Sequence, residues 1–210
     1  MSIVEFVWWS GSDEFLADLN GSFKPMIDYV SSADGCLRIL SGLEAEPDER
    51  NFWMVVVWES HELHQAMMAR PDYPTMVGRL KPFFRDGILK MNHVKFNRDT
   101  DTAFKAPVTA IAFITLKGNT TLKDLDKLLN FTQQLCDPEK GGHPPTAWGN
   151  TEEDEKQVLV ISGWDSVEAR QAVMANAANI AKFRETVLEG YKAVDVKSVH
   201  LKLRENFVRT

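Results

Sequence analysis

The chain has 210 residues, a formal net charge of −6 and 44% hydrophobic residues, so its length fits one large domain or two of about 100 residues each. Nucleic-acid binding and polybasic membrane anchoring both require clustered positive charge, and the acidic balance argues against both kinds of partner. No stretch approaches the length of a membrane-spanning helix and the N-terminus lacks the basic segment of a signal peptide, so we expect a cytoplasmic protein.

The first half of the chain alternates between strand-like and helix-like segments. Runs rich in β-branched and aromatic residues predict strands, and apolar residues three and four positions apart predict helices. Gly21 and Pro25 weaken the first helix, whereas Glu59 or Ser60 caps the second. The acidic segment 44–51 is expected to be a hairpin loop. The predicted strands are 3–9, 36–42, 52–58 and 88–96, and the predicted helices are 13–31, a segment from 60 to 70, and a short one ending at 84.

The second half repeats this order of elements after a polar segment that ends in a proline, as a linker does. We therefore place a first repeat at 1–98, a linker at 99–107 and a second repeat at 108–210. The predicted elements of the second repeat are strands at 109–116, 157–164 and 193–203, helices at 121–136 and 165–189, and a loop with a short strand around Trp148.

Two stretches of the chain are nearly the same. WESHELHQAMMA (58–69) and WDSVEARQAVMA (164–175) agree in their Trp, Ser, Glu, Gln, Ala and Met positions, which indicates a duplication. Each copy has the β-α-β-β-α-β order of a ferredoxin-like unit, whose sheet carries helices on one face and needs cover on the other. The sequence therefore predicts an α+β protein in which two tandem ferredoxin-like repeats pack their antiparallel sheets face to face as an intramolecular barrel.

This pattern resembles the dimeric α+β barrel superfamily, especially the antibiotic-biosynthesis-monooxygenase-like (ABM) domains, in a tandem duplicated form. The resemblance implies a small-molecule protein without a bound cofactor, since relatives include cofactor-free oxygenases of aromatic polyketides, cyclases and dehydratases. Haem-degrading enzymes and proteins without known activity also belong to it, and the fold does not choose among them. Where haem-degrading relatives carry their Trp and His, this chain has Met67, Met68 and Val77. The segments that carry the resemblance are 55–60, 61–76, 93–96 and 158–175.

The two copies differ at positions that could carry chemistry. His61 and His64 stand where the second copy has Val167 and Arg170. They are three positions apart and share one face near the start of a helix. They are either surface histidines or general bases that project into a cavity. A third alternative is that the pair binds a metal ion, but the sequence shows only two ligands and no obviously placed carboxylate, so no metal ligand is assigned.

Two further histidines lie in the last predicted strand of each copy. His93 shares a strand face with Met91 and Lys95, which allows it to point outward. His200 matches His93 with a slip of one residue, so the pair has either a role in the fold or a role in a site. His93 joins His61 and His64 as a candidate catalytic base. Cys36 and Cys136 are too few for a disulfide framework and are expected to be reduced thiols.

Aromatic residues and one loop are the candidate ligand-binding elements. Trp8 and Trp9 are adjacent in a strand and must face opposite sides, while Trp58 and Trp164 are a repeated pair expected in the core. The segment GGHPPTAWGN breaks the repeat, and its glycines and prolines predict a rigid loop. The residues expected to contact a ligand are Trp8, Trp53, Trp58, His143 and Trp148.

Together with these candidate residues, the resemblance implies an enzyme that acts on an aromatic or polyketide-like compound without a bound cofactor. The reaction would be an oxygenation, a cyclisation or a dehydration, with His61, His64 or His93 as the base. The alternatives are a non-catalytic or stress-associated carrier with the same cavity, and a haem-binding member of the superfamily. The expected partner is an aromatic small molecule, and exposed edge strands also allow a homodimer of the fused repeats.

Overall fold

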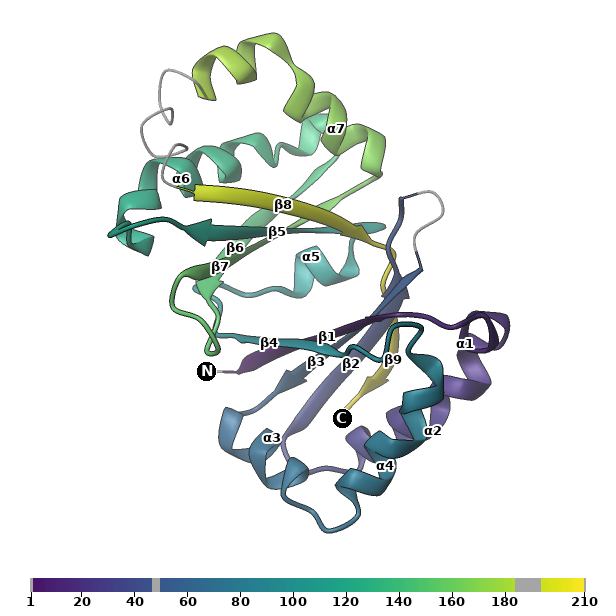
Figure 1. Cartoon of the computed structure of the whole chain (residues 1–210). Coiled ribbons are helices and arrows are strands. Elements are labelled where there is room, and N and C mark those ends of the chain that lie inside the picture. The colour runs from purple at the N-terminus through teal and green to yellow at the C-terminus, as the bar shows by residue number, and fades with distance from the viewer. Residues whose placement is uncertain (1, 47–49, 184–193, 210) are drawn as a thin grey trace. The chain divides into compact units, whose positions relative to one another are not determined.

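The computed structural model describes residues 2–46, 50–183 and 194–209 and contains two antiparallel sheets (Figure 1). The chain divides into two compact units, residues 1–95 with 204–210, and residues 96–203. The α+β class and the tandem organisation predicted from the sequence are confirmed. No helix in the described part of the chain has the length and apolar character needed to span a membrane.

The first unit is a five-stranded sheet in the order β4-β1-β3-β2-β9. Ser60 ends the extended chain and accepts a hydrogen bond from Leu63 N, which caps the helix that carries His61 and His64. The strands are β1 (Ile3–Ser10), β2 (Cys36–Leu43), β3 (Asn51–Trp58), β4 (Lys90–Val94) and β9 (Arg204–Val208). The helices are α1 (Asp13–Ala17), α2 (Leu19–Ser31), α3 (His61–Met68) and α4 (Tyr73–Leu80), followed by the short 3₁₀ turn η1 (Lys81–Phe83).

The second unit is a four-stranded sheet in the order β6-β7-β5-β8. Ser166 caps its helix α7 as Ser60 caps α3, by accepting a hydrogen bond from Ala169 N. The strands are β5 (Val108–Leu116), β6 (Gly142–Asn150), β7 (Gln157–Trp164) and β8 (Val194–Leu201). The helical segments are α5 (Asp101–Lys105), η2 (Leu122–Leu125), α6 (Asp126–Leu135), η3 (Pro138–Lys140) and α7 (Val167–Ala175). The predicted helix 165–189 and strand 193–203 extend into 184–193, which lie outside the described residues.

Three features differ from the sequence predictions. The segment around His143 is not a loop but the strand β6, which tolerates two prolines because it is an edge strand with an irregular register between His143 and Ala147. The predicted linker contains α5, which buries Ala103 and Phe104. Residues 204–208 form β9, which pairs with β2 and so belongs to the first unit rather than to the second repeat.

The sheet registers show which residues of the two units are equivalent. Ile3 lies opposite Trp58 in the first unit, and Val108 lies opposite Trp164 in the second. With the two Trp residues aligned, three residues on the helix-covered face of β1 correspond to three on β5. These pairs are Glu5 with Ala110, Val7 with Ala112, and Trp9 with Ile114.

The helix-covered face of the first unit is filled by aromatic side chains. Trp9 lies 5.4 Å from Phe15, 6.3 Å from Phe23 and 5.1 Å from Phe52, measured between ring centroids. Trp8 points to the opposite face of the sheet, as predicted, and stacks on Trp53 at 4.6 Å. The second unit has the smaller residues Ala110, Ala112 and Ile114 on its helix-covered face, and this difference in volume leaves room for a cavity.

Candidate functional site

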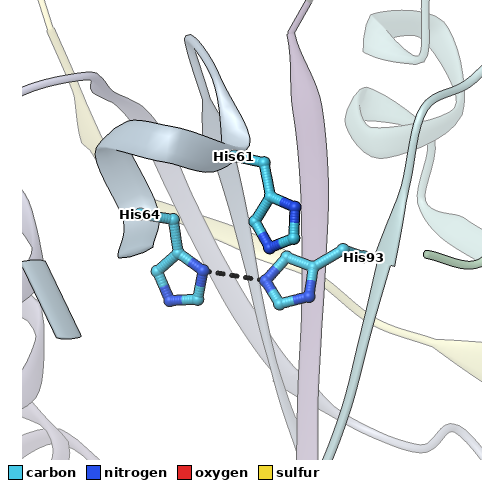
Figure 2. A group of neighbouring side chains, drawn as sticks. All are labelled: His61, His64 and His93. Carbon is cyan, nitrogen blue, oxygen red and sulfur yellow. Dashed lines mark hydrogen bonds between the residues drawn. The ribbon is translucent and has the colours of Figure 1, made fainter. Parts of the chain in front are cut away.

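Three histidines of the first unit converge between helix α3 and strand β4 (Figure 2). His64 and His93 are buried and His61 is half-buried, and each offers a ring nitrogen within 4.8 Å of the others. Nε2 of His93 lies 2.8 Å from Nδ1 of His64, so one nitrogen donates and the other accepts. The ring of His61 stacks on that of His93 with a centroid separation of 4.7 Å. The structure thus unites the three predicted catalytic histidines, and His93 points toward the helices rather than outward.

A buried carboxylate lies behind these histidines. Glu5 is directly opposite His93 on the neighbouring strand β1 and is 3% exposed. Its Oε2 accepts a hydrogen bond of 2.7 Å from Trp58 Nε1, and its Oε1 lies 3.5 Å from His64 Nε2. The Trp58 ring also stacks on His64 at 4.9 Å. A buried carboxylate requires such partners, because an isolated charge in this environment costs several kcal/mol.

Of the residues predicted to bind a ligand, Trp58 belongs to the histidine cluster, and the others lie in other surroundings. Trp53 donates a hydrogen bond from Nε1 to Glu44, and Trp148 stacks under the guanidinium of Arg98. His143 Nε2 lies 2.7 Å from Asp165 Oδ1. Each unit has a cavity next to its helices, and the linings of these two cavities include none of the five residues predicted to contact a ligand.

The second unit contains a cavity of about 470 Å³ between its sheet and its helices. Its walls are mostly apolar, with Ala110 and Ala112 on the floor where the first unit has Glu5 and Val7. The full lining is Ala110, Ala112, Ile114, Leu128, Phe131, Thr132, Leu135, Thr146, Val160, Ser162, Trp164, Arg170, Met174, Asn179, Ile180, Phe183, Val196 and Ser198. Its volume lies within the range of about 300–1,000 Å³ that is typical of small-molecule sites.

The lining of this cavity contains the polar donors Arg170, Ser162 and Ser198. Arg170 donates to His200 Nε2 at 2.9 Å and to Ser198 Oγ at 3.2 Å. Because a guanidinium only donates, His200 accepts through Nε2 and carries its proton on Nδ1. Ser162 Oγ accepts from Trp164 Nε1 at 2.9 Å. Each serine oxygen receives a hydrogen bond, so each hydroxyl hydrogen can be directed to a ligand.

A second cavity of about 400 Å³ lies between α2 and α4 of the first unit. Tyr29 at its edge donates a hydrogen bond of 2.8 Å to Asp72. Burial and the neighbouring Asp72 carboxylate raise the pKa of Tyr29. This tyrosine therefore stays protonated at neutral pH.

Sequence reasoning missed Glu5 as well as the three donors of the second-unit cavity. Glu5 is a single acid in the otherwise apolar segment IVEFVWW, and a charge at such a position signals a buried partner. Arg170 was visible only as the residue that replaces His64. Ser162 and Ser198 carry no signal in the sequence, because their role depends on the register of β7 and β8 with β5.

Comparisons with known proteins give matches in structure but not in sequence. No family model matches the chain, and no curated protein matches it. An anthrone oxidase-like protein matches with a TM-score of 0.67 at 14% identity, over 97% of this chain and 92% of the other. A proposed monooxygenase from Fusobacterium nucleatum gives 0.64 at 10% identity, over 98% and 94% of the chains. A proposed monooxygenase from Lactobacillus acidophilus gives 0.61 at 13% identity, over 100% and 96%.

These likenesses span almost the full length of each chain, so the duplication itself is shared and not only one half of it. At identities of 10–14% they establish the fold and leave the chemistry to the residues of the site. The chain has the tandem dimeric α+β barrel fold, in which two α+β units with antiparallel sheets follow each other in one polypeptide.

Proposed function

We propose that the second unit binds a flat aromatic compound with an acidic oxygen and promotes the reaction of its anion without a bound cofactor. The observation that carries the proposal is that the hydrogen-bonded pair Arg170 and Ser198 lies in the wall of one mostly apolar cavity. Apolar walls hold the ring system, while Arg170 and Ser198, which are joined by a hydrogen bond of 3.2 Å, are placed to hold one oxygen atom of the ligand.

The donor set suits an anion better than a neutral ligand. Arg170 stays charged at all relevant pH values, and its guanidinium is held in place by hydrogen bonds to His200 and Ser198. A phenol or enol that binds with its oxygen at Arg170 is therefore more acidic in the cavity than in water. Such an anion is electron-rich, and it is the species from which oxygenation, cyclisation or dehydration of an aromatic ketone begins.

His200 acts as a positioning residue in this proposal. It is buried, and it accepts a hydrogen bond from the guanidinium that faces the cavity. Its neutral ring fixes the direction of Arg170 without neutralising its charge. General-base catalysis by His61, His64 or His93 stays a prediction, and the lining of the second-unit cavity includes none of these three residues.

Oxygenation is the reaction to examine first, because one full-length structural neighbour is described as anthrone oxidase-like. Anthrone tautomerises to a phenol, whose anion reacts with molecular oxygen. One anthrone and one O₂ give one anthraquinone and one water, so the reaction needs no further reductant. Within this cavity Arg170 would hold the anionic oxygen while the ring carbon opposite to it reacts.

The test uses the purified chain with anthrone as the probe, and it follows oxygen uptake and anthraquinone formation. We expect turnover above the rate without protein, and a loss of about 100-fold in Arg170→Ala, the size of effect seen when one anion-stabilising donor is removed. Arg79→Ala is the matched control, because Arg79 lines the other cavity. Equal rates with Arg170→Ala and the original chain would contradict the proposal. Anthrone binding without oxygen uptake would support a non-catalytic carrier instead.

A further inference from the structure

The histidine cluster of the first unit has a donor set that the proposed function does not use. His61 and His64 lie in the first turns of α3, and His93 lies on β4, so two separate elements present three imidazoles to one point (Figure 2). Their ring nitrogens all lie within 4.8 Å of one another. Three imidazoles with one open position are the donor set of catalytic zinc sites.

The distances are close to those that a metal requires. Zinc binds imidazole nitrogen at about 2.0–2.1 Å, so two nitrogens of a tetrahedral site lie roughly 3.3 Å apart. Nδ1 of His64 and Nε2 of His93 lie 2.8 Å apart and share one proton. A metal ion that replaces this proton needs the rings to separate by about half an ångström. His61 is half-buried, so its side chain has the freedom to turn its nitrogen toward the same point.

Glu5 and Trp58 complete the surroundings of the site. When His64 binds a metal through Nδ1, its Nε2 carries the proton and faces Glu5 Oε1, 3.5 Å away. This is the carboxylate–histidine–metal arrangement that fixes the tautomer of the ligand and raises its basicity. Trp58 holds the other oxygen of Glu5 at 2.7 Å. The buried negative charge also offsets part of the charge of a divalent cation.

The second unit provides an internal comparison. At the positions of Glu5, His64 and His93 it has Ala110, Arg170 and His200. The histidine of the strand is retained, while the carboxylate is lost and a ligand is replaced by a cation. A guanidinium repels a metal ion and cannot coordinate one. Among the residues that the structure describes, only the first unit therefore has this set of metal donors.

We propose that His61, His64 and His93 bind one divalent transition-metal ion of the zinc or cobalt class, with Glu5 as the outer carboxylate. His64 coordinates through Nδ1 and His93 through Nε2, and the fourth position is open beside the half-buried His61. This inference is independent of the proposed function, because the metal-binding residues belong to the first unit and the residues that line the proposed ligand cavity belong to the second.

The test is equilibrium binding of Zn²⁺ to the untagged full chain after treatment with a chelator, followed by binding of Co²⁺ monitored through its visible absorption. We expect one ion per chain and the intense visible bands of four-coordinate cobalt. His64→Ala and His93→Ala should each weaken binding at least tenfold. Glu5→Gln should weaken it by about 10–100-fold, the usual effect of losing an outer carboxylate.

Two variants keep the test decisive even if a buried substitution prevents folding. His61→Ala changes a half-buried residue and should still weaken binding at least tenfold in a folded protein. His143→Ala is the matched control, because it removes a histidine that pairs with Asp165 in the second unit, and it should leave the metal affinity unchanged. Absence of zinc binding, or equal affinity in His61→Ala and the original chain, would overturn the proposal.

Discussion

His64 and Arg170 occupy the same position in the two halves, four residues after the capping serines Ser60 and Ser166, and each contacts a histidine on a neighbouring strand. His64 contacts His93 at 2.8 Å, whereas Arg170 contacts His200 at 2.9 Å. The exchange of imidazole for guanidinium reverses the charge of the ligand that this position can bind. The first unit can offer neutral donors to a cation, and the second can offer a cation to an anionic ligand.

The first prediction compares two histidines that are three positions apart. His64 is 0% exposed and contacts both His93 and Trp58, so His64→Ala removes buried contacts and leaves a cavity. We expect its free energy of unfolding to fall by about 2–4 kcal/mol. His61→Ala, at a half-buried position, should change it by less than about 1 kcal/mol. Urea unfolding with a chelator present measures both, and equal losses would contradict the burial argument.

The second prediction concerns one position of the duplicated sheet. Val7 packs in the filled core of the first unit, and its equivalent Ala112 lines the cavity of the second. Val7→Phe should lower the free energy of unfolding by about 1–3 kcal/mol, because a well-packed core has no room for the larger ring. Ala112→Phe places the same ring in existing space and should cost less than about 1 kcal/mol.

Ligand binding provides an independent readout of this pair. Ala112→Phe should reduce the affinity for anthrone, because the ring occupies the floor of the cavity. Val7→Phe should leave the affinity for anthrone unchanged under conditions in which the variant is folded. An Ala112→Phe variant that unfolds more easily than Val7→Phe would show that the cavity is not available space.

The sequence alone was sufficient to predict the duplication and most of the helices and strands, because the hydrophobic patterns and the Trp–acid–Ser junction recur in both halves. It also selected His61, His64 and His93. It did not reveal Glu5, since only the pairing of β1 with β4 places Glu5 opposite His93. Residues 204–208 have no continuous apolar run, and β9 forms because β2 offers an edge to pair with.

The third prediction tests how the end of the chain holds the first unit. Arg209 follows β9 and donates hydrogen bonds to the carbonyls of Ser31, Ala33 and Cys36 at 2.7–3.0 Å. Arg209 is exposed, so water replaces part of what Arg209→Ala removes, and the free energy of unfolding should fall by about 1 kcal/mol. Arg204→Ala removes another exposed arginine, at the start of β9, and should change it by less than about 0.5 kcal/mol. Thermal unfolding of the two variants separates these effects, and similar losses would show that the strand rather than the Arg209 contacts matters.

The last prediction follows from the buried thiol at the start of β2. Burial raises the pKa of Cys36 from its ordinary value of 9.0 to about 11. The folded state therefore prefers the neutral thiol more strongly than the unfolded state does. The stabilisation is fully present below pH 9 and is lost as the pH rises from 9 to about 11.

Two pKa units correspond to about 3 kcal/mol, so the free energy of unfolding should fall by up to that amount across this range on account of Cys36. Other groups titrate at the same pH, and Cys36→Ala isolates the thiol because it keeps them all. We expect the variant to lose less stability than the original chain between pH 9 and 11 in urea titrations. If the free energies of unfolding of the two proteins fell in parallel over this pH range, the pKa of Cys36 would be the same in the folded and unfolded states. That result would contradict the burial argument.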